Sequence, residues 1–231
     1  MRSKFQMLPP EPQRASTVAE QVFDMLHEKI LTLELPPGTK LSEVDVSTLV
    51  GVSRQPVREA FSRLSKLGFL LIRPQRATIV RPISEKEVLQ AMYIRSALEI
   101  EVVRTAALGI QPQDLKELSI LLEKQEQAAK AGERIVFHTL DDLFHKHISE
   151  AAGVGFVWAI IKENKAHMDR VRYLTLSFGT ETALNEHEEI YEAIAAKDQA
   201  KAVEGMRKHL SRIKYDLPRI RDEHREYFAE E

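Results

Sequence analysis

The sequence predicts a mostly α-helical protein, in which a small N-terminal unit with two short strands precedes a C-terminal all-α bundle of six to seven helices. Apolar side chains recur at helical spacing along most of the 231 residues, and clear β-prone runs occur only between residues 69 and 80. Charge also divides near Pro82. Residues 1–82 hold 12 basic and 8 acidic side chains, whereas residues 83–231 hold 21 and 27. The net charge of −2 therefore combines a basic part with an acidic part.

The N-terminal unit is predicted to span residues 16–82, after a flexible segment at 1–15. Its three helices are expected at 17–33, 42–50 and 53–68. The first helix begins with a capping box, Thr17-x-x-Glu20, in which each side chain accepts a hydrogen bond from the other residue's backbone N–H. Ser53 is expected to cap the third helix with its side chain.

Two short β-prone runs, 69–72 and 78–80, follow the third helix and enclose a polar turn at 73–76. A pair of helices joined by a short turn and followed by a two-stranded hairpin is the arrangement of a winged helix-turn-helix. We therefore predict a winged helix-turn-helix at residues 16–82.

This predicted unit carries the side chains that a DNA-binding surface needs. Seven basic residues and one acidic residue lie between Arg54 and Arg81. Arg54 and Arg58 share one face of the third helix, and arginine is the usual bidentate reader of guanine. Further candidates are Gln55 for adenine or phosphate, Ser53 for phosphate, and Arg73, Gln75 and Arg76 in the wing for backbone or minor groove. The alternative is an ordinary solvated basic face.

These segments resemble a known family. The stretches PPGTKLSE, LVGVSRQPVREAFSRLSKLGFL and RPQRATIV, all within residues 18–82, are similar to the DNA-binding domain of the GntR family. The resemblance implies that Arg54 and Arg58 contact bases. The chain departs from the family at Val44, where an arginine that contacts DNA is frequent, and at Ala77, where the wing tip usually has glycine.

The C-terminal part, residues 83–231, is predicted to be a helical bundle. Ser84-x-x-Glu87 is a second capping box at its start. Helices are expected at 84–108, 112–131, 133–152, 155–178, 181–196 and 198–215, followed by a short tail after Pro218.

Four ionisable side chains lie on helix faces that are otherwise apolar. Asp141 and His145 are neighbours at i, i+4, and His187 and His209 each lie among apolar residues of a later helix. Burial without partners would cost about 2–7 kcal/mol for each group, so we expect the four to satisfy one another. The chain has no cysteine, and one carboxylate with three imidazoles suits a divalent ion of the zinc or nickel kind.

The alternative for a lone histidine on an apolar face is a satisfied core residue, but four such groups at helical spacing favour a metal site. The other histidines have no such company and are interpreted as surface or packing residues: His27, His138, His147, His167 and His224.

The same four residues carry a second resemblance. The stretches ALEIE, DDLFHKHISEAAG, NEHEEIYEAIAAKD and GMRKHL, within residues 90–215, resemble the FCD effector domain of the FadR subfamily. In metal-binding members, an Asp-x-x-x-His pair and two later histidines coordinate the ion. The resemblance therefore implies the same four residues as metal ligands here, with zinc as the first choice and nickel and manganese as the alternatives.

The resemblance also implies an effector, because family members sense small carboxylates or sugar acids that bind at the metal and pair with nearby arginines. The candidates are Arg95, which with Glu99 matches the family's R-x-x-L-E, and Arg172 or Arg170. Alternatively, Arg95 and Glu99 form a pair on the helix surface that is worth about 0.3–0.5 kcal/mol.

Together these features predict a ligand-responsive, sequence-specific DNA-binding transcription regulator, in which a small carboxylate metabolite relieves repression. A homodimer on a palindromic operator is expected, because one winged helix offers too few base contacts. The bundle at 83–231 would supply the dimer contact and the effector cavity. Two alternatives are the same fold with a purely structural metal and no effector, and a metal-dependent hydrolase, which would leave the DNA-binding unit unexplained.

The sequence also bears on location. Residues 1–14 lack the apolar run of a secretory signal, and the longest uncharged apolar run, 151–161, is too short to span a bilayer. We therefore expect a cytoplasmic protein with no membrane partner.

Overall fold

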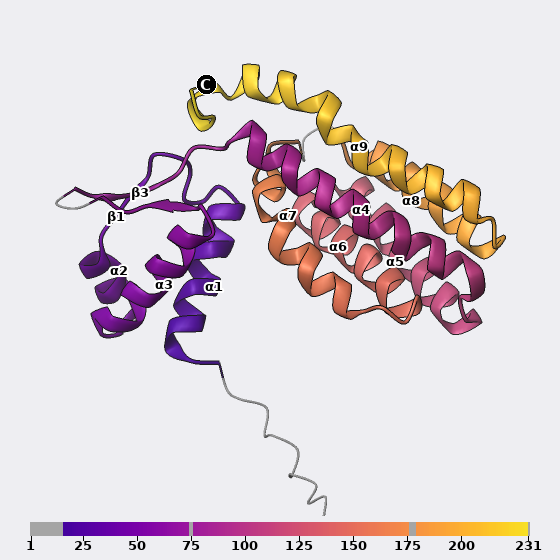
Figure 1. Cartoon of the computed structure of the whole chain (residues 1–231), viewed down its shortest axis with the longest axis horizontal. Helices are drawn as coiled ribbons and strands as arrows, with labels where there is room; N and C mark the ends of the chain where they lie inside the picture. The colour runs from indigo at the N-terminus through magenta and orange to yellow at the C-terminus, as the bar shows by residue number, and fades with distance from the viewer. Residues whose placement is uncertain (1–15, 74–75, 176–178, 231) are drawn as a thin grey trace, which may run out of the picture. The chain divides into compact units, whose positions relative to one another are not determined.

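A computed structural model describes residues 16–73, 76–175 and 179–230 (Figure 1). The predicted flexible segment 1–15 and the wing candidate Gln75 lie outside these residues. The described chain is mostly helical and forms two compact units, which divide at Arg81 and Pro82; residues 30–38 associate with the second unit. The predicted fold class is confirmed.

The first unit contains the three predicted helices, except for the last two residues of the first one. They are α1 (Val18–Leu31), α2 (Glu43–Val50) and α3 (Arg54–Lys66). The capping box before α1 is formed as predicted, because the backbone N–H of Glu20 donates to Thr17 Oγ1 at 3.2 Å and that of Thr17 donates to Glu20 Oε2 at 2.7 Å. The helix ends before Leu33, whose φ of 59° is left-handed.

The turn between α2 and α3 sets the position of the third helix. Gly51 ends α2 with a φ of 72°, a conformation that favours glycine. Ser53 precedes α3, but its side chain makes no capping hydrogen bond, so the predicted cap is wrong in this respect. Pro56, at the third position of α3, has no N–H, which removes one of the two backbone donors that a cap side chain can accept from.

A three-stranded antiparallel sheet completes the first unit. Its strands β1 (Lys40–Leu41), β2 (Leu70–Leu71) and β3 (Thr78–Val80) are ordered β1-β3-β2. The predicted hairpin corresponds to β2 and β3, whose register pairs Leu70 with Val80. The sequence analysis missed β1, a two-residue strand that pairs Lys40 with Ile79.

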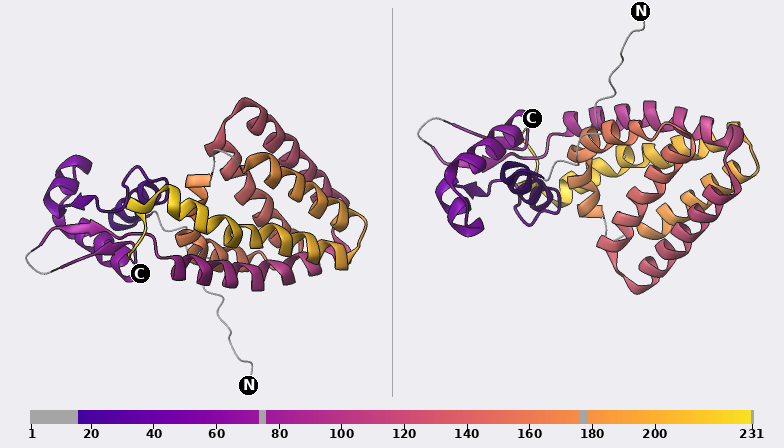
Figure 2. Two further views of the ribbon diagram at one scale, coloured as in Figure 1. Left: turned by 90° about the horizontal axis from the view of Figure 1, so that it is seen from above. Right: turned by 90° about the horizontal axis from the view of Figure 1, so that it is seen from below.

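The described part of the second unit contains six α-helices and a short 3-10 turn, Arg225–Tyr227. The helices are α4 (Glu85–Gly109), α5 (Pro112–Ala131), α6 (Arg134–Ala151), α7 (Phe156–Thr175), α8 (Thr180–Ala195) and α9 (Gln199–Glu223). Figure 2 shows α4 and α9 side by side along the bundle, and α8 packs on α9. Buried apolar residues of α4, α5, α6, α7, α8 and α9 form one core.

The last helix differs from the prediction. We expected a helix at 198–215 and a tail after Pro218, but α9 continues through Pro218 to Glu223. A proline inside a helix costs about 3 kcal/mol, whereas burying a leucine or isoleucine contributes about 1.5–3 kcal/mol. Leu217 and Ile220, on either side of Pro218, are both buried in an apolar cluster. Their combined burial, about 3–6 kcal/mol, offsets the cost of the proline.

Candidate functional site

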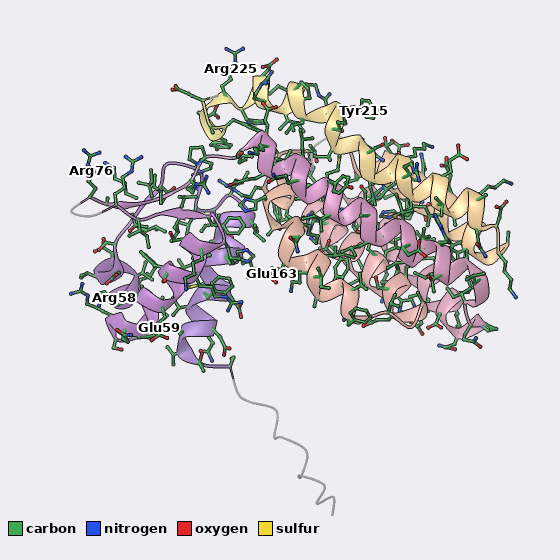
Figure 3. All side chains as sticks on the ribbon, in the orientation of Figure 1. Arg58, Glu59, Arg76, Glu163, Tyr215 and Arg225 are labelled. Carbon is green, nitrogen blue, oxygen red and sulfur yellow. The ribbon has the colours of Figure 1, made fainter. Side chains whose placement is uncertain are left out.

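The third helix presents two arginines on one exposed face. The side chains of Arg54 and Arg58 are each 59% exposed, because Val57, Ala60, Phe61 and Leu64 occupy the buried face. Figure 3 shows Arg58 projecting outward from the ribbon, near Glu59. Gln55 is also exposed and donates a hydrogen bond from Nε2 to Glu59 Oε1 at 3.0 Å.

A carboxylate that the sequence analysis missed contacts both arginines. Arg58 donates from Nη2 to Glu43 Oε2 at 3.1 Å and from Nε to both carboxylate oxygens at 3.3 Å. Arg54 Nη2 lies 3.5 Å from Glu43 Oε2. The hydrogen bond from Arg58 is the largest influence on the pKa of Glu43, which is lowered despite partial burial. No periodicity links positions 43 and 58, so only the packing of α2 against α3 shows this contact.

The described wing residues are exposed. Arg73 and Arg76 come before and after residues 74–75, which lie outside the described residues, and the backbone N–H of Arg76 donates to the carbonyl of Arg73 at 3.3 Å. Figure 3 shows the Arg76 side chain extending away from the hairpin. Val44 and Ala77, the two departures from the GntR pattern, are exposed too.

The four predicted metal ligands lie together in the bundle. Asp141 and His145 come from α6, His187 from α8 and His209 from α9. All four side chains are nearly buried, and one potential ligand atom of each lies within 4.8 Å of those of the other three. Helical periodicity thus predicted residues that tertiary packing brings together.

The distances within this cluster suit a small cation. His209 Nε2 lies 3.2 Å from His145 Nε2 and 3.3 Å from His187 Nε2. Asp141 Oδ1 lies 3.5 Å from His187 Nε2. Tetrahedral ligands at about 2.0–2.1 Å from zinc lie roughly 3.3–3.4 Å from one another, which matches these separations.

The outer nitrogens of the three imidazoles face acceptors. His187 Nδ1 lies 2.7 Å from Gln125 Oε1, and Gln125 Nε2 donates to the Leu140 carbonyl, which orients the amide. His145 Nδ1 pairs with the Glu99 carboxylate, and His209 Nδ1 lies 2.9 Å from Glu186 Oε2. In the tautomer that donates from Nδ1 to these acceptors, the three Nε2 lone pairs converge on one point. A divalent cation satisfies such a set of acceptors.

The pKa values of three residues in the cluster are shifted in the direction that favours cation binding. Burial and the neighbouring His209 lower the pKa of His187 well below its usual value, and burial lowers the pKa of His209 to about 4. Burial alone would raise the pKa of Asp141, but Arg172 together with the histidines holds it well below its usual value. Near neutral pH, His187 and His209 are therefore neutral imidazoles and Asp141 is a carboxylate, the ligand forms that bind metal.

A cavity of about 100 Å³ adjoins the cluster and is lined by Asp141 and His209. Its remaining lining includes three arginines, Arg95, Arg172 and Arg212. A water needs about 10–15 Å³ of such volume, so the cavity has room for a small organic anion. The sequence analysis missed Arg212, which binds Glu186 and, at 3.4 Å, the carbonyl of Gly179.

The Arg95–Glu99 pair is buried, so its alternative interpretation as a surface pair is wrong. The two residues are 3% and 2% exposed, and Arg95 Nε donates to Glu99 Oε1. Arg95 Nη2 is buried with no hydrogen-bond partner in the described structure. An unpaired buried donor costs about 1–3 kcal/mol, and more when charged, so this nitrogen is poised for an acceptor in the cavity.

Arg172 lines the same cavity but is already paired. It donates to Asp141, to Asp169 at 3.3 Å and to Asp142 at 3.5 Å. Arg170, the other candidate, is fully buried and does not line the cavity. His138, interpreted from sequence as a surface or packing residue, is buried and lines the cavity, 3.9 Å from Asp169.

Comparisons with known proteins agree with this architecture. The family model "Bacterial regulatory proteins, gntR family" matches residues 18–80, and the FCD domain model matches residues 90–212. The HTH-type transcriptional repressor RspR of Escherichia coli K12 is 35% identical over the whole of both chains. The regulator McbR of the same strain is 30% identical over 84% of this chain and 87% of its own.

Solved structures show the same fold. E. coli McbR/YncC has a TM-score of 0.74 at 23% identity and covers 91% of this chain and 100% of its own. A putative GntR regulator from Rhodococcus sp. RHA1 has a TM-score of 0.70 at 22% identity, with 87% and 97% covered.

These relatives are transcriptional regulators rather than enzymes, so the hydrolase alternative is dropped. None of the helices in the described part of the chain is long and apolar enough to cross a membrane. Its helix-turn-helix unit and its FCD bundle together place the chain in the GntR family of bacterial transcriptional regulators.

Proposed function

We propose that this regulator is a repressor that binds a palindromic operator as a homodimer and releases it when a small carboxylate or sugar acid enters the cavity of the bundle. The observation that carries this proposal is the unpaired Arg95 Nη2 beside a cluster built for a divalent cation. Residues 16–82 would bind DNA, and residues 83–231 would bind the effector and form the dimer.

On the DNA side, the exposed face of α3 supplies the base contacts. Arg54 and Arg58 read guanine, and Gln55 reads adenine or contacts phosphate. Ser53, Arg73 and Arg76 contact the backbone or minor groove. Support comes from the exposure of these side chains and from the match of residues 18–80 to the GntR model. A dimer doubles the base contacts and explains the expected symmetry of the operator.

On the effector side, Asp141, His145, His187 and His209 hold the ion. Three imidazoles and one carboxylate favour zinc, with nickel and manganese as the alternatives. A bound divalent ion supplies a Lewis-acidic centre that attracts an anionic oxygen. Arg95 donates from Nη2 to the effector carboxylate, and Arg172 holds Asp141 in place while it contributes positive charge to the cavity wall.

Coupling to DNA requires that the effector prefers one conformation of the dimer. The shift in operator affinity cannot exceed the ratio of the effector's affinities for the two conformations. Arg212 links the wall of the cavity to Glu186 and to the start of α8, so an anion that attracts Arg212 acts on the position of this helix.

A carboxylate panel tests the proposal. Full-length protein is loaded with zinc or treated with chelator, and its melting temperature is measured with citrate, malate, gluconate and related acids. We expect one class of acid to stabilise only the zinc-loaded protein and to release bound operator. If zinc stabilises the protein but no acid adds to this effect, the metal is purely structural.

Arg95→Lys sharpens the test, because lysine keeps the charge but loses the second guanidinium nitrogen. We expect it to reduce the response to the acid. Arg104→Lys is the matched control, since Arg104 lies on the same helix with its side chain 47% exposed. An equal response in both variants would contradict the assignment of Arg95.

A further inference from the structure

Glu43, the first residue of α2, stands opposite the proposed base-reading arginines. Its carboxylate accepts hydrogen bonds from Arg58 at 3.1–3.3 Å and lies 3.5 Å from Arg54. The two arginines are one turn apart on α3, so one carboxylate holds both. Its side chain is 27% exposed, less than half the exposure of either arginine.

The contact with Arg58 occupies one edge of the guanidinium. Nε and Nη2 both point at Glu43, which leaves Nη1 and the outer N–H of Nη2 free to make a bidentate contact with guanine. A flexible arginine that is fixed at two points has already lost much of its rotamer freedom before it meets DNA. Glu43 therefore favours one defined geometry of contact between Arg58 and guanine.

The charge of Glu43 affects the binding of these arginines to DNA phosphates more than their binding to guanine. A DNA phosphate carries a full negative charge and is repelled by a neighbouring carboxylate, whereas the O6 and N7 of guanine are neutral acceptors. Phosphate contacts dominate binding to any sequence, and base contacts create specificity. A carboxylate at this position therefore weakens non-specific binding more than specific binding.

We propose that Glu43 is a specificity-determining residue, which positions Arg54 and Arg58 for guanine and disfavours their capture by phosphates. This inference rests on the proposed function, in which α3 reads the operator. It adds a residue of the preceding helix, which touches the reading side chains rather than the bases.

The experiment uses the full-length chain and two DNA duplexes. One duplex is the palindrome that wild-type protein enriches from a random pool, and the other is a scrambled duplex of the same composition. We expect Glu43→Gln to lower the ratio of the two affinities about tenfold, within the range for one guanine contact. Its non-specific binding should depend more steeply on salt, by about 0.9 in the log–log slope for each added phosphate contact.

Asp45→Asn is the matched control. Asp45 is an exposed acid in the first turn of the same helix, and its removal changes the charge of the unit by the same amount. It should change the affinity for both duplexes alike, so that their ratio stays that of the wild type. Glu43→Asp retains the charge and should keep the shallow salt dependence of non-specific binding.

Three outcomes would overturn the inference: equal ratios for Glu43→Gln and Asp45→Asn, loss of affinity for both duplexes at an unchanged salt slope, or a steep slope in Glu43→Asp. Should Glu43→Gln not fold, as judged by its melting curve, the salt dependence of Glu43→Asp decides.

Arg58→Ala distinguishes a failure of this inference about Glu43 from a failure of the proposed function of α3. If that variant binds both duplexes like the wild type, the proposed role of α3 fails; if it loses only the palindrome, the role stands whatever Glu43 does.

Discussion

Both units of this regulator place carboxylates against cationic or ionisable nitrogens, but one cluster is exposed and the other is buried. Arg54 and Arg58 keep most of their surface in water around Glu43, whereas His145 and His187 have no exposed side-chain surface. Water can replace a partner at the surface at little cost, so contacts there can exchange for DNA. In the interior every lone pair needs a permanent partner, and the proposed cation would provide it.

The largest expected effect is on the buried cluster. His187→Ala removes an Nε2 ligand, so chelator-sensitive stability should disappear. For wild type with free zinc at 100 to 1,000 times its Kd, chelation should lower the free energy of unfolding by about 2.7–4.1 kcal/mol. Urea unfolding with and without chelator measures this. His147→Ala, on α6 beside Asp114, should respond to chelator like the wild type; a chelator response in His187→Ala would break the assignment.

The exposed cluster predicts a different pattern. Arg58→Ala should weaken binding to the enriched palindrome by about 1–3 kcal/mol, the value of one guanine contact, and leave the melting temperature nearly unchanged because the side chain is exposed. Titrations at matched salt measure the affinity. Lys66→Ala, in the last turn of α3, is the control. Equal losses for both variants would mean that only the basic charge of the helix matters.

Replacing an acceptor that contacts the Nδ1 atom of an imidazole should have an intermediate effect, which is on zinc affinity. Glu186 accepts from His209 Nδ1 and from Arg212, so Glu186→Gln removes a charge that orients the ligand. Zinc affinity should fall about 10–100-fold, as measured by competition with a coloured chelator. Glu189→Gln, on the same helix but paired with the exposed Lys208, should not change it.

The smallest effect concerns pH. Burial and the nearby Arg172 lower the pKa of His138 to about 4, whereas an unfolded histidine has a pKa of about 6.5. The unfolded chain therefore binds more protons between these values, and stability is lost as the pH falls from about 6.5 towards 4. His138→Gln should remove up to about 1.4 kcal/mol per pH unit of this slope. Urea unfolding of chelator-treated protein at pH 7, 6 and 5 checks it, and an unchanged slope would contradict it.

Local signals in the sequence predicted most of the fold. The Thr17–Glu20 capping box identified the start of α1, and the spacing of Asp141 and His145 placed both on one helix face. These features depend on residues three or four positions apart. The two-residue β1 has no periodicity to detect, and the extension of α9 past Pro218 depends on the burial of Leu217 and Ile220 in the bundle.

The candidate site was predictable only in part, because sequence spacing reveals contacts within one helix but not contacts between helices. The four buried candidate ligands could be recognised in the sequence because their neighbours on each helix face are apolar. Gln125 and His187 are 62 positions apart, and Glu43 and Arg58 are 15 apart on different helices, so no sequence spacing links them. The contacts that orient both clusters come from tertiary packing.

Metal analysis of the purified protein after equilibration with divalent ions tests the central claim most directly. Elemental analysis of wild type, Asp141→Ala and His147→Ala, purified without chelator and then equilibrated with zinc, nickel or manganese, gives the ion bound per chain. We predict one divalent ion per chain in wild type and in His147→Ala, with zinc retained best, and almost none in Asp141→Ala. Wild-type protein that retains no divalent metal after this equilibration, or Asp141→Ala that retains as much as wild type, would contradict the account.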